Sequence, residues 1–125
     1  MSAKDNAVVA RALQDAFERG DMARIDELIA DDVVWHEIGR AEPRRGKEAL
    51  RASGPGGAAD YRITGTTHDV LASDDHAIAL LEAAATRAGK TFTYRTAEIY
   101  HIRDGKITER WAFSDDTAAI AAFFA

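Results

Sequence analysis

The sequence predicts one small α+β domain, in which two amphipathic helices precede a chain rich in strands. Apolar residues recur at helical spacing over Ala7–Glu18 and again after Gly20. Four later segments are rich in β-branched and aromatic residues and are separated by short turn signals. A length of 125 residues is typical of one domain with its own core, so we expect residues 1–125 to form a single unit.

Composition excludes several functional classes. The net charge of -5 argues against nucleic acid as a partner, because neutralising phosphates requires clustered lysine and arginine. The short basic cluster of Arg44, Arg45 and Lys47 lies beside Glu42 and Glu48, and we interpret it as a solvated loop. Because the chain contains no cysteine, it has no disulfide, no thiolate nucleophile and no cysteine-ligated metal.

The N-terminal segment and the length of the apolar runs indicate where in the cell the protein is expected. Met1–Asp5 leads into a polar helical pattern rather than an apolar signal segment. No apolar run approaches the roughly 20 residues that a membrane span needs. We therefore expect a cytoplasmic protein without membrane contact.

The first half of the chain is predicted to be mainly helical. Helix Ala7–Glu18 should end at Gly20, where a left-handed residue commonly closes a helix. Asp21 is a suitable N-cap for a second helix that includes Ile29 and ends at Asp31 and Asp32. The elements expected next are a strand over Val33–Ile38, a short helix over Gly46–Ala52 and a loop over Ser53–Gly57.

The second half is predicted to be strands joined by hairpins. Asp104-Gly105 is a strong two-residue turn signal, because both central positions of a type I′ turn need positive φ; Ala88-Gly89 is a weaker one. The expected elements are strands Tyr61–Ala72, His76–Thr86, Thr91–Ile102 and Ile107–Ser114, and a final helix Thr117–Phe124.

Tight hairpins would fix which side chains share a face of the sheet. The expected cross-strand pairs are His68 with Leu81, Val70 with Ala79, Ala83 with Tyr94, Leu81 with Thr96, Tyr100 with Glu109, Glu98 with Trp111, and Thr96 with Phe113. The inner face would then carry His68, Val70, Ala79, Leu81, Ala83, Phe92, Tyr94, Thr96, Glu98, Tyr100, Glu109, Trp111, Phe113 and Asp115. Aromatic and small residues with a few polar groups are typical of a small-molecule pocket.

The outer face is predicted to meet a second subunit. It would carry Ile78, Leu80, Glu82, Arg95, Ala97, Ile99, His101 and Arg110. Glu82 would pair with Arg95 across strands, and the apolar centre around Leu80, Ala97 and Ile99 could be covered in a homodimer. His76 and His101 are interpreted as interface or surface residues.

An ordered set of motifs carries a resemblance to a known family. The motifs are Val34-Trp35-His36, Gly46-Lys47-Glu48, His68-Asp69-Val70-Leu71, Asp104-Gly105-Lys106-Ile107-Thr108-Glu109 and Trp111 to Asp115. In this order the chain resembles the SnoaL-like branch of the nuclear transport factor 2-like superfamily. The resemblance implies a cone-shaped fold: a strongly bent, mostly antiparallel sheet wrapped around three helices, with a short C-terminal helix, an internal cavity and often a dimer.

The resemblance implies function less directly than fold. Similar proteins include ketosteroid isomerases, polyketide cyclases, dehydratases and epoxide hydrolases, besides proteins that only bind ligands, so fold alone does not determine the chemistry. We expect a small apolar or aromatic molecule in the cavity and no cofactor. The expected activity is a cofactor-free isomerase, polyketide cyclase or dehydratase that abstracts a proton next to a carbonyl; the alternative is a non-catalytic binding or dimerisation module.

Four residues are candidates for acid–base chemistry. Asp115 lies where related cyclases place the carboxylate base; the alternative is that Asp115 or Asp116 is the N-cap of the last helix. Glu98 is expected on the inner face, as an acid–base group or in a structural salt bridge. His36 and His68 come from separate strands and are candidates for a proton carrier, or for structural histidines.

The remaining candidates would line the pocket. The expected ligand-binding residues are Trp35, Tyr94, Thr96, Trp111 and Phe113, of which the aromatic ones are also natural core residues. The Tyr94 hydroxyl could donate a hydrogen bond to a substrate oxygen. The sequence contains no His-x-His or His-Glu-x-x-His spacing, so no metal site is expected.

Overall fold

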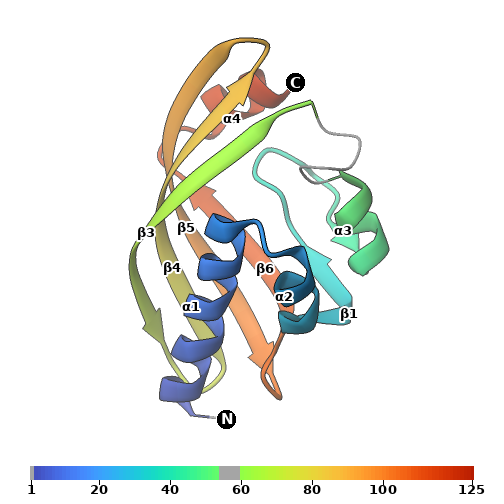
Figure 1. The fold of residues 1–125 in the computed structure, drawn as a ribbon, viewed down its shortest axis with the longest axis vertical. Helices are drawn as coiled ribbons and strands as arrows, with labels where there is room; N and C mark the ends of the chain where they lie inside the picture. Colours follow the sequence, from blue (N-terminus) through green and yellow to red (C-terminus); the bar gives the residue numbers. More distant parts are fainter. Residues whose placement is uncertain (1, 54–59) are drawn as a thin grey trace.

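The protein is an α+β fold built on one six-stranded sheet (Figure 1). The computed structural model describes residues 2–53 and 60–125. The strands lie in the order β2-β1-β6-β5-β4-β3. Neighbouring strands are antiparallel except β1 and β6, which run parallel. The predicted fold class, a curved and mostly antiparallel sheet with helices and a short C-terminal helix, is confirmed.

Local capping signals determine the two N-terminal helices. Helix α1 (Ala3–Arg19) begins at a capping box in which Ser2 and Asp5 satisfy each other's backbone N–H groups, so it starts earlier than the periodic pattern alone indicates. It ends at Gly20, whose φ of 68° is left-handed, as predicted. Helix α2 (Met22–Leu28) is capped by Asp21, as predicted, through a bond from the Arg24 N–H.

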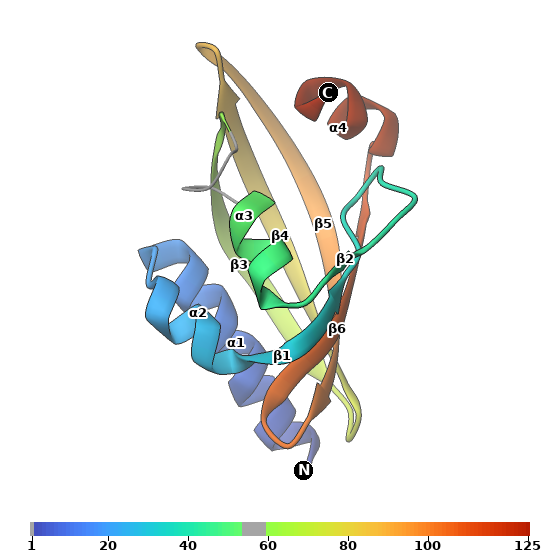
Figure 2. The same cartoon turned by 90° about the vertical axis from the view of Figure 1, so that its right-hand side faces the viewer.

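Helix α1 packs across β3 and β4, α2 lies beside β1, and α3 (Lys47–Ser53) lies beside β1 and β2. These three helices lie on one side of the bent sheet, and we call that face the concave face (Figure 2). Helix α4 (Thr117–Phe124) follows β6 near the tip of the β4–β5 hairpin (Figure 1). The core lies between α1, α2 and the sheet. It includes Val9, Leu13, Ile25, Leu28, Val33, Val70, Ala77, Ala79, Tyr100 and Ile107.

The hairpins of the second half form where the sequence predicts them. Strands β4 (His76–Arg87) and β5 (Lys90–Arg103) are joined by Ala88-Gly89, and β6 (Lys106–Ser114) follows Asp104-Gly105. All four turn residues have positive φ, as type I′ turns require: 52° and 78° in the first turn, 52° and 77° in the second. The predicted pairs Ala83 with Tyr94 and Leu81 with Thr96 are confirmed.

A β-bulge at Thr108 overturns the predicted phase of β6. Ile102 pairs with Ile107 but His101 pairs with Glu109, so β6 contains one extra residue. The observed pairs are Thr96 with Ser114, Glu98 with Ala112, Tyr100 with Arg110, Ile99 with Trp111, and His101 with Glu109. Arg110, Ala112 and Ser114 therefore face the concave side. Glu109, Trp111, Phe113 and Asp115 face the opposite, convex side, contrary to the prediction.

A second bulge lies at His68 in β3 (Arg62–Ala72). Thr67 pairs with Leu81 and Asp69 with Leu80, so His68 has no partner across the strand. The predicted pair of His68 with Leu81 is therefore wrong, whereas Val70 with Ala79 is confirmed. His68 is exposed.

The segment before α3 is more ordered than predicted. Strand β1 spans Ile29–Trp35, and β2 (Arg44–Arg45) pairs with its end. Arg44 donates to Glu37 at 2.6 Å, and the Lys47 ammonium lies 3.2 Å from Asp31, so the interpretation of this basic cluster as a solvated loop is wrong. Of the predicted glycine-rich loop, residues 54–57 lie outside the described residues.

Candidate functional site on the concave face

A buried ion pair lies at the centre of the concave face. Glu98 on β5 and Arg110 on β6 both have about 10% of their side-chain area exposed. The Arg110 Nη2 atom lies 2.8 Å from each Glu98 carboxylate oxygen, and Nε lies 3.2 Å from Oε1. The bulge at Thr108 places Arg110 on this face. The pair therefore depends on an irregularity of the sheet.

Further donors complete the shell around the Glu98 carboxylate. Thr96 Oγ1 donates to Oε2 at 3.1 Å, and the Tyr100 hydroxyl donates to Oε1 at 3.2 Å. Gln14, from α1, donates to the same tyrosine oxygen at 2.6 Å. The network thus joins the first helix to two central strands and holds the carboxylate in one orientation.

Arg110 is held from its other side by β1. Its Nη1 atom donates to the His36 carbonyl at 2.8 Å, and its guanidinium carbon lies 4.7 Å from the centre of the Trp35 ring. Burial opposes the charge of Arg110, but the adjacent Glu98 carboxylate outweighs this effect and raises the pKa of the guanidinium. The guanidinium therefore stays charged inside the fold.

Tyr94 lies on the concave face next to the ion pair. It lies on β5 opposite the small Ala83. Burial, and secondarily the charge of Glu98, raise the pKa of its phenol to about 12, so its hydroxyl is neutral near pH 7. Within residues 2–53 and 60–125 this hydroxyl has no hydrogen-bond partner.

An aromatic cluster borders Tyr94 and attaches α4 to the sheet. Ring centres lie 5.5 Å apart for Phe92 and Tyr94, 5.3 Å for Phe92 and Phe123, and 6.3 Å for Tyr94 and Phe124. Tyr61 meets Phe124 edge to face at 4.9 Å. A group of this kind presents flat apolar surface next to the polar centre.

Comparison with known proteins identifies the family. The model of the SnoaL-like domain matches residues 9–110. The chain belongs to this family. It is thus a SnoaL-like protein, in agreement with the motifs of the sequence. No curated protein matches the SnoaL-like chain.

Solved structures share the fold over at least 90% of the chain. Bal32a, from a soil-derived mobile gene cassette, is 26% identical with a TM-score of 0.85, and the match covers 98% of each chain. A putative polyketide cyclase from Silicibacter sp. TM1040 is 18% identical with a TM-score of 0.83, covering 100% of this chain and 98% of that one. An epoxide hydrolase of the LEH-like type from M. tuberculosis is 18% identical with a TM-score of 0.74, covering 90% and 84%. At 18% identity these likenesses concern the fold alone.

The SnoaL-like fold brings together only part of the predicted site. Tyr94, Thr96 and Glu98 share the concave face, and Trp35 contacts Arg110 there. The other predicted residues lie elsewhere: His36 packs against Trp111 and Glu109, Phe113 is 61% exposed, and His68 and Asp115 are exposed. The expected inward placement of Trp111, Phe113 and Asp115 is wrong because of the bulge in β6.

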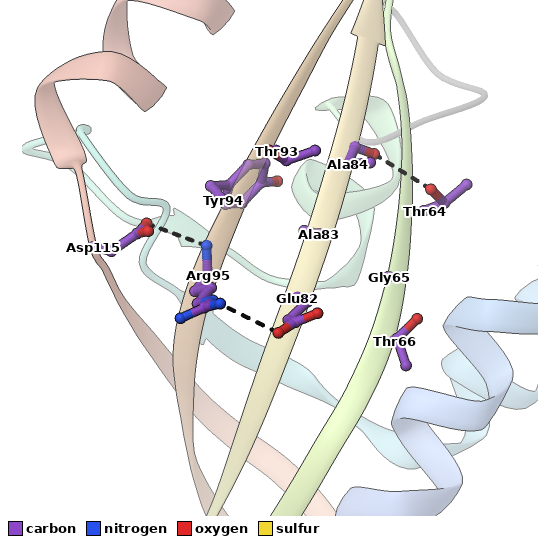
Figure 3. A pocket seen from close by; sticks show the side chains of 10 residues that line it. All are labelled: Thr64, Gly65, Thr66, Glu82, Ala83, Ala84, Thr93, Tyr94, Arg95 and Asp115. Atoms are coloured by element: carbon purple, nitrogen blue, oxygen red, sulfur yellow. Dashed lines mark hydrogen bonds and ion pairs between the residues drawn. The ribbon is translucent and has the colours of Figure 1, made fainter.

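The two adjacent aspartates at the end of β6 have different roles. The Asp116 carboxylate accepts a bond from the Ala119 N–H at 3.0 Å and is the N-cap of α4. Asp115 accepts a bond from the Arg95 N–H at 3.1 Å. It borders an open hollow of about 510 Å³ with Glu82, Arg95 and Thr64 (Figure 3). The capping alternative is therefore confirmed for Asp116.

Sequence reasoning missed three members of the polar centre. Regular alternation assigns Arg110 to the outer face, and the helical pattern of the first helix gives Gln14 no role. Tyr100 was expected on the inner face without a role, yet it links Gln14 to Glu98. A signal was present for Arg110: a lone buried glutamate needs a cationic partner, and β6 supplies one.

The described residues show neither a metal cluster nor a spanning helix. In residues 2–53 and 60–125 no group of three histidine, aspartate or glutamate side chains is arranged to hold a metal ion. Over the same ranges no helix is both long and apolar enough to cross a membrane.

Proposed function

We propose that this SnoaL-like protein binds a small apolar or aromatic molecule on its concave face, between the aromatic cluster and the Glu98–Arg110 pair. The body of the ligand would lie against Tyr94 and the neighbouring rings. A ligand oxygen would accept a hydrogen bond from the Tyr94 hydroxyl, which is worth about 0.5–1.5 kcal/mol.

The buried ion pair is the observation that carries this proposal. Removing two charges from water costs several kcal/mol for each ion, and apolar residues of the same volume are often as stabilising. Glu98 and Arg110 nevertheless lie in the interior. Hydrogen bonds from Thr96 and Tyr100 hold the Glu98 carboxylate in a fixed orientation. Such a fixed dipole next to apolar surface supports a role in orienting a polar group of a ligand.

Filling the proposed site is its most direct test. Ala83 faces the concave side opposite Tyr94, and the neighbouring Ala84, equally half-buried, pairs with Thr93 on the convex side. We expect Ala83→Trp to weaken binding of the fluorescent dye anilinonaphthalene sulfonate by at least about tenfold, or about 1.4 kcal/mol. The matched variant Ala84→Trp should bind as the wild type does. Equal binding by both variants would exclude the concave face as the dye site.

A second candidate is cofactor-free catalysis of the isomerase, cyclase or dehydratase type. Its support is the position of Glu98, a carboxylate held beside apolar rings. In this proposal a Glu98 oxygen takes a proton from the carbon next to a substrate carbonyl, displacing the bond from Thr96, while Tyr94 donates to the resulting enolate oxygen. In an isomerase the proton then returns from Glu98 to a different carbon of the conjugated enolate. Asp115, on the convex face, takes no part.

Proton exchange tests catalysis without knowledge of the substrate. The enzyme should accelerate exchange of the acidic carbon-bound hydrogens of β-tetralone in deuterated water, followed by NMR. Glu98→Gln should reduce this acceleration by about 100-fold or more, the usual contribution of a positioned base. Asp115→Asn is the control and should exchange normally. If the wild type gives no acceleration with β-tetralone and a wider set of ketones, the binding role stands alone.

The convex face supports the expected homodimer. Phe113 is 61% exposed there, beside the half-buried Trp111, Ile99 and Leu80. We infer that a second copy of the chain covers this apolar surface, because a contiguous exposed patch of large apolar residues commonly marks an interface.

A further inference from the structure

The convex face is built of four rows that run across the strands. Two apolar rows lie in the middle, each formed by one residue from β4, β5 and β6. One row is Ile78, Ile99 and Trp111, and the next is Leu80, Ala97 and Phe113. A polar row borders the apolar rows on each side.

The first polar row is rich in histidine. His36 Nε2 lies 2.8 Å from Glu109 Oε2, and His101 Nδ1 lies 3.9 Å from Oε1 of the same carboxylate. The ring centres of His76 and His101 are 4.2 Å apart. Trp111 lies against both His36 and His101, at 5.3 Å and 4.7 Å. We call these residues, His76, His101, Glu109 and His36, the histidine row.

The charged groups around the histidine row come from every neighbouring strand. His76 comes from β4, His101 from β5, Glu109 from β6, and His36 follows β1. Glu109 is the one acidic side chain in contact with these rings among the described residues, so two histidines share one carboxylate. Protonation of more than one histidine therefore gives the row an excess of positive charge.

The second polar row is acidic. It consists of Glu82, Arg95 and Asp115, one from each of the same three strands or their ends (Figure 3). Arg95 Nε lies 3.6 Å from Glu82 Oε1, and both side chains are largely exposed. With two carboxylates and one guanidinium, this acidic row carries an excess of negative charge.

We propose that the convex faces of two chains pack about a two-fold axis that crosses the strands between the two apolar rows, and that mild acid strengthens this dimer. This inference rests on the homodimer proposed above. Such an axis places the histidine row of each subunit against the acidic row of the other. It also places the large Ile99 against the small Ala97 of the other subunit, which favours close packing.

The sign of the pH effect follows from this arrangement. In the dimer each histidine row faces an acidic row, whereas in the monomer it faces water, so protonated histidines are favoured in the dimer. The dimer then binds more protons than two monomers do, so lowering the pH shifts the equilibrium toward the dimer. A two-fold axis parallel to the strands would instead place the two histidine rows against each other. Acid would then weaken the dimer.

Sedimentation equilibrium of the full chain tests the proposal. Between about pH 8 and about pH 6, at constant ionic strength, we expect the dimer dissociation constant to fall by about tenfold, because each dimer gains two sets of histidine–carboxylate contacts. His101→Gln should remove most of this change. His68→Gln is the matched control, because His68 is exposed on β3 and lies outside the histidine row, and it should respond as the wild type does.

Each outcome separates the two proposals. A monomer at both pH values, at concentrations of hundreds of micromolar, would overturn the dimer and this inference together. A dimer whose dissociation constant is equal at both pH values would overturn only the pH response. A dimer that weakens in acid would exclude the proposed axis. If His101→Gln and His68→Gln both kept the full pH dependence of dimerisation, the histidine row would be excluded as the source of that dependence.

Discussion

Replacing Arg110 with methionine is expected to lower the free energy of unfolding by about 3–5 kcal/mol, because the change leaves the Glu98 carboxylate buried without its partner. Methionine keeps much of the length and apolar contact of the arginine stem. Urea unfolding near neutral pH measures the loss.

The matched control removes both charges together. Glu98→Leu combined with Arg110→Met should recover to within about 2 kcal/mol of the wild type, since no lone charge remains in the interior. The residual cost would come from Thr96 and Tyr100, which lose their acceptor. A loss below about 1 kcal/mol in the single Arg110→Met variant would show that the guanidinium is solvated rather than buried.

Alanine substitution of the two tryptophans should destabilise the protein by very different amounts, because the two side chains lie on opposite faces of the sheet. Trp35 is 8% exposed, belongs to the core and lies under Arg110. Trp35→Ala should therefore cost about 3–5 kcal/mol. Trp111 is half-buried on the convex face, so Trp111→Ala should cost less than about 1.5 kcal/mol in dilute protein.

This comparison also tests the phase of β6. Regular alternation after the Asp104-Gly105 turn would bury Trp111 and expose Arg110. The bulge at Thr108 reverses both. Chemical unfolding of the two alanine variants side by side measures the difference. Equal losses, or a larger loss for Trp111→Ala, would contradict the observed register.

Much of the fold could be predicted because its determinants are local. Gly20 ends the first helix, Asp21 caps the second, and Asp104-Gly105 closes a hairpin, each through the conformational preference of one or two residues. The tight turn at Ala88-Gly89 then fixes the register of β4 and β5. At these helix ends and hairpin turns, the local backbone geometry alone determines the structure.

The candidate site was harder to predict because bulges depend on packing across the sheet. Nothing in the sequence around Thr108 or His68 marks an extra residue, yet each one changes which side chains face inward. Glu98 and Tyr94 were placed correctly because β5 is regular next to β4. Arg110 could be recognised only by asking which cation neutralises the buried Glu98.

The position of a bound ligand can be read from the two indole N–H resonances of the protein, one from each face of the sheet. Trp35→Phe and Trp111→Phe variants assign the two signals in a nitrogen–proton correlation spectrum. On titration with anilinonaphthalene sulfonate we expect the Trp35 indole signal to shift and saturate while the Trp111 signal stays in place. A shift of the Trp111 signal alone would contradict a binding site on the concave face.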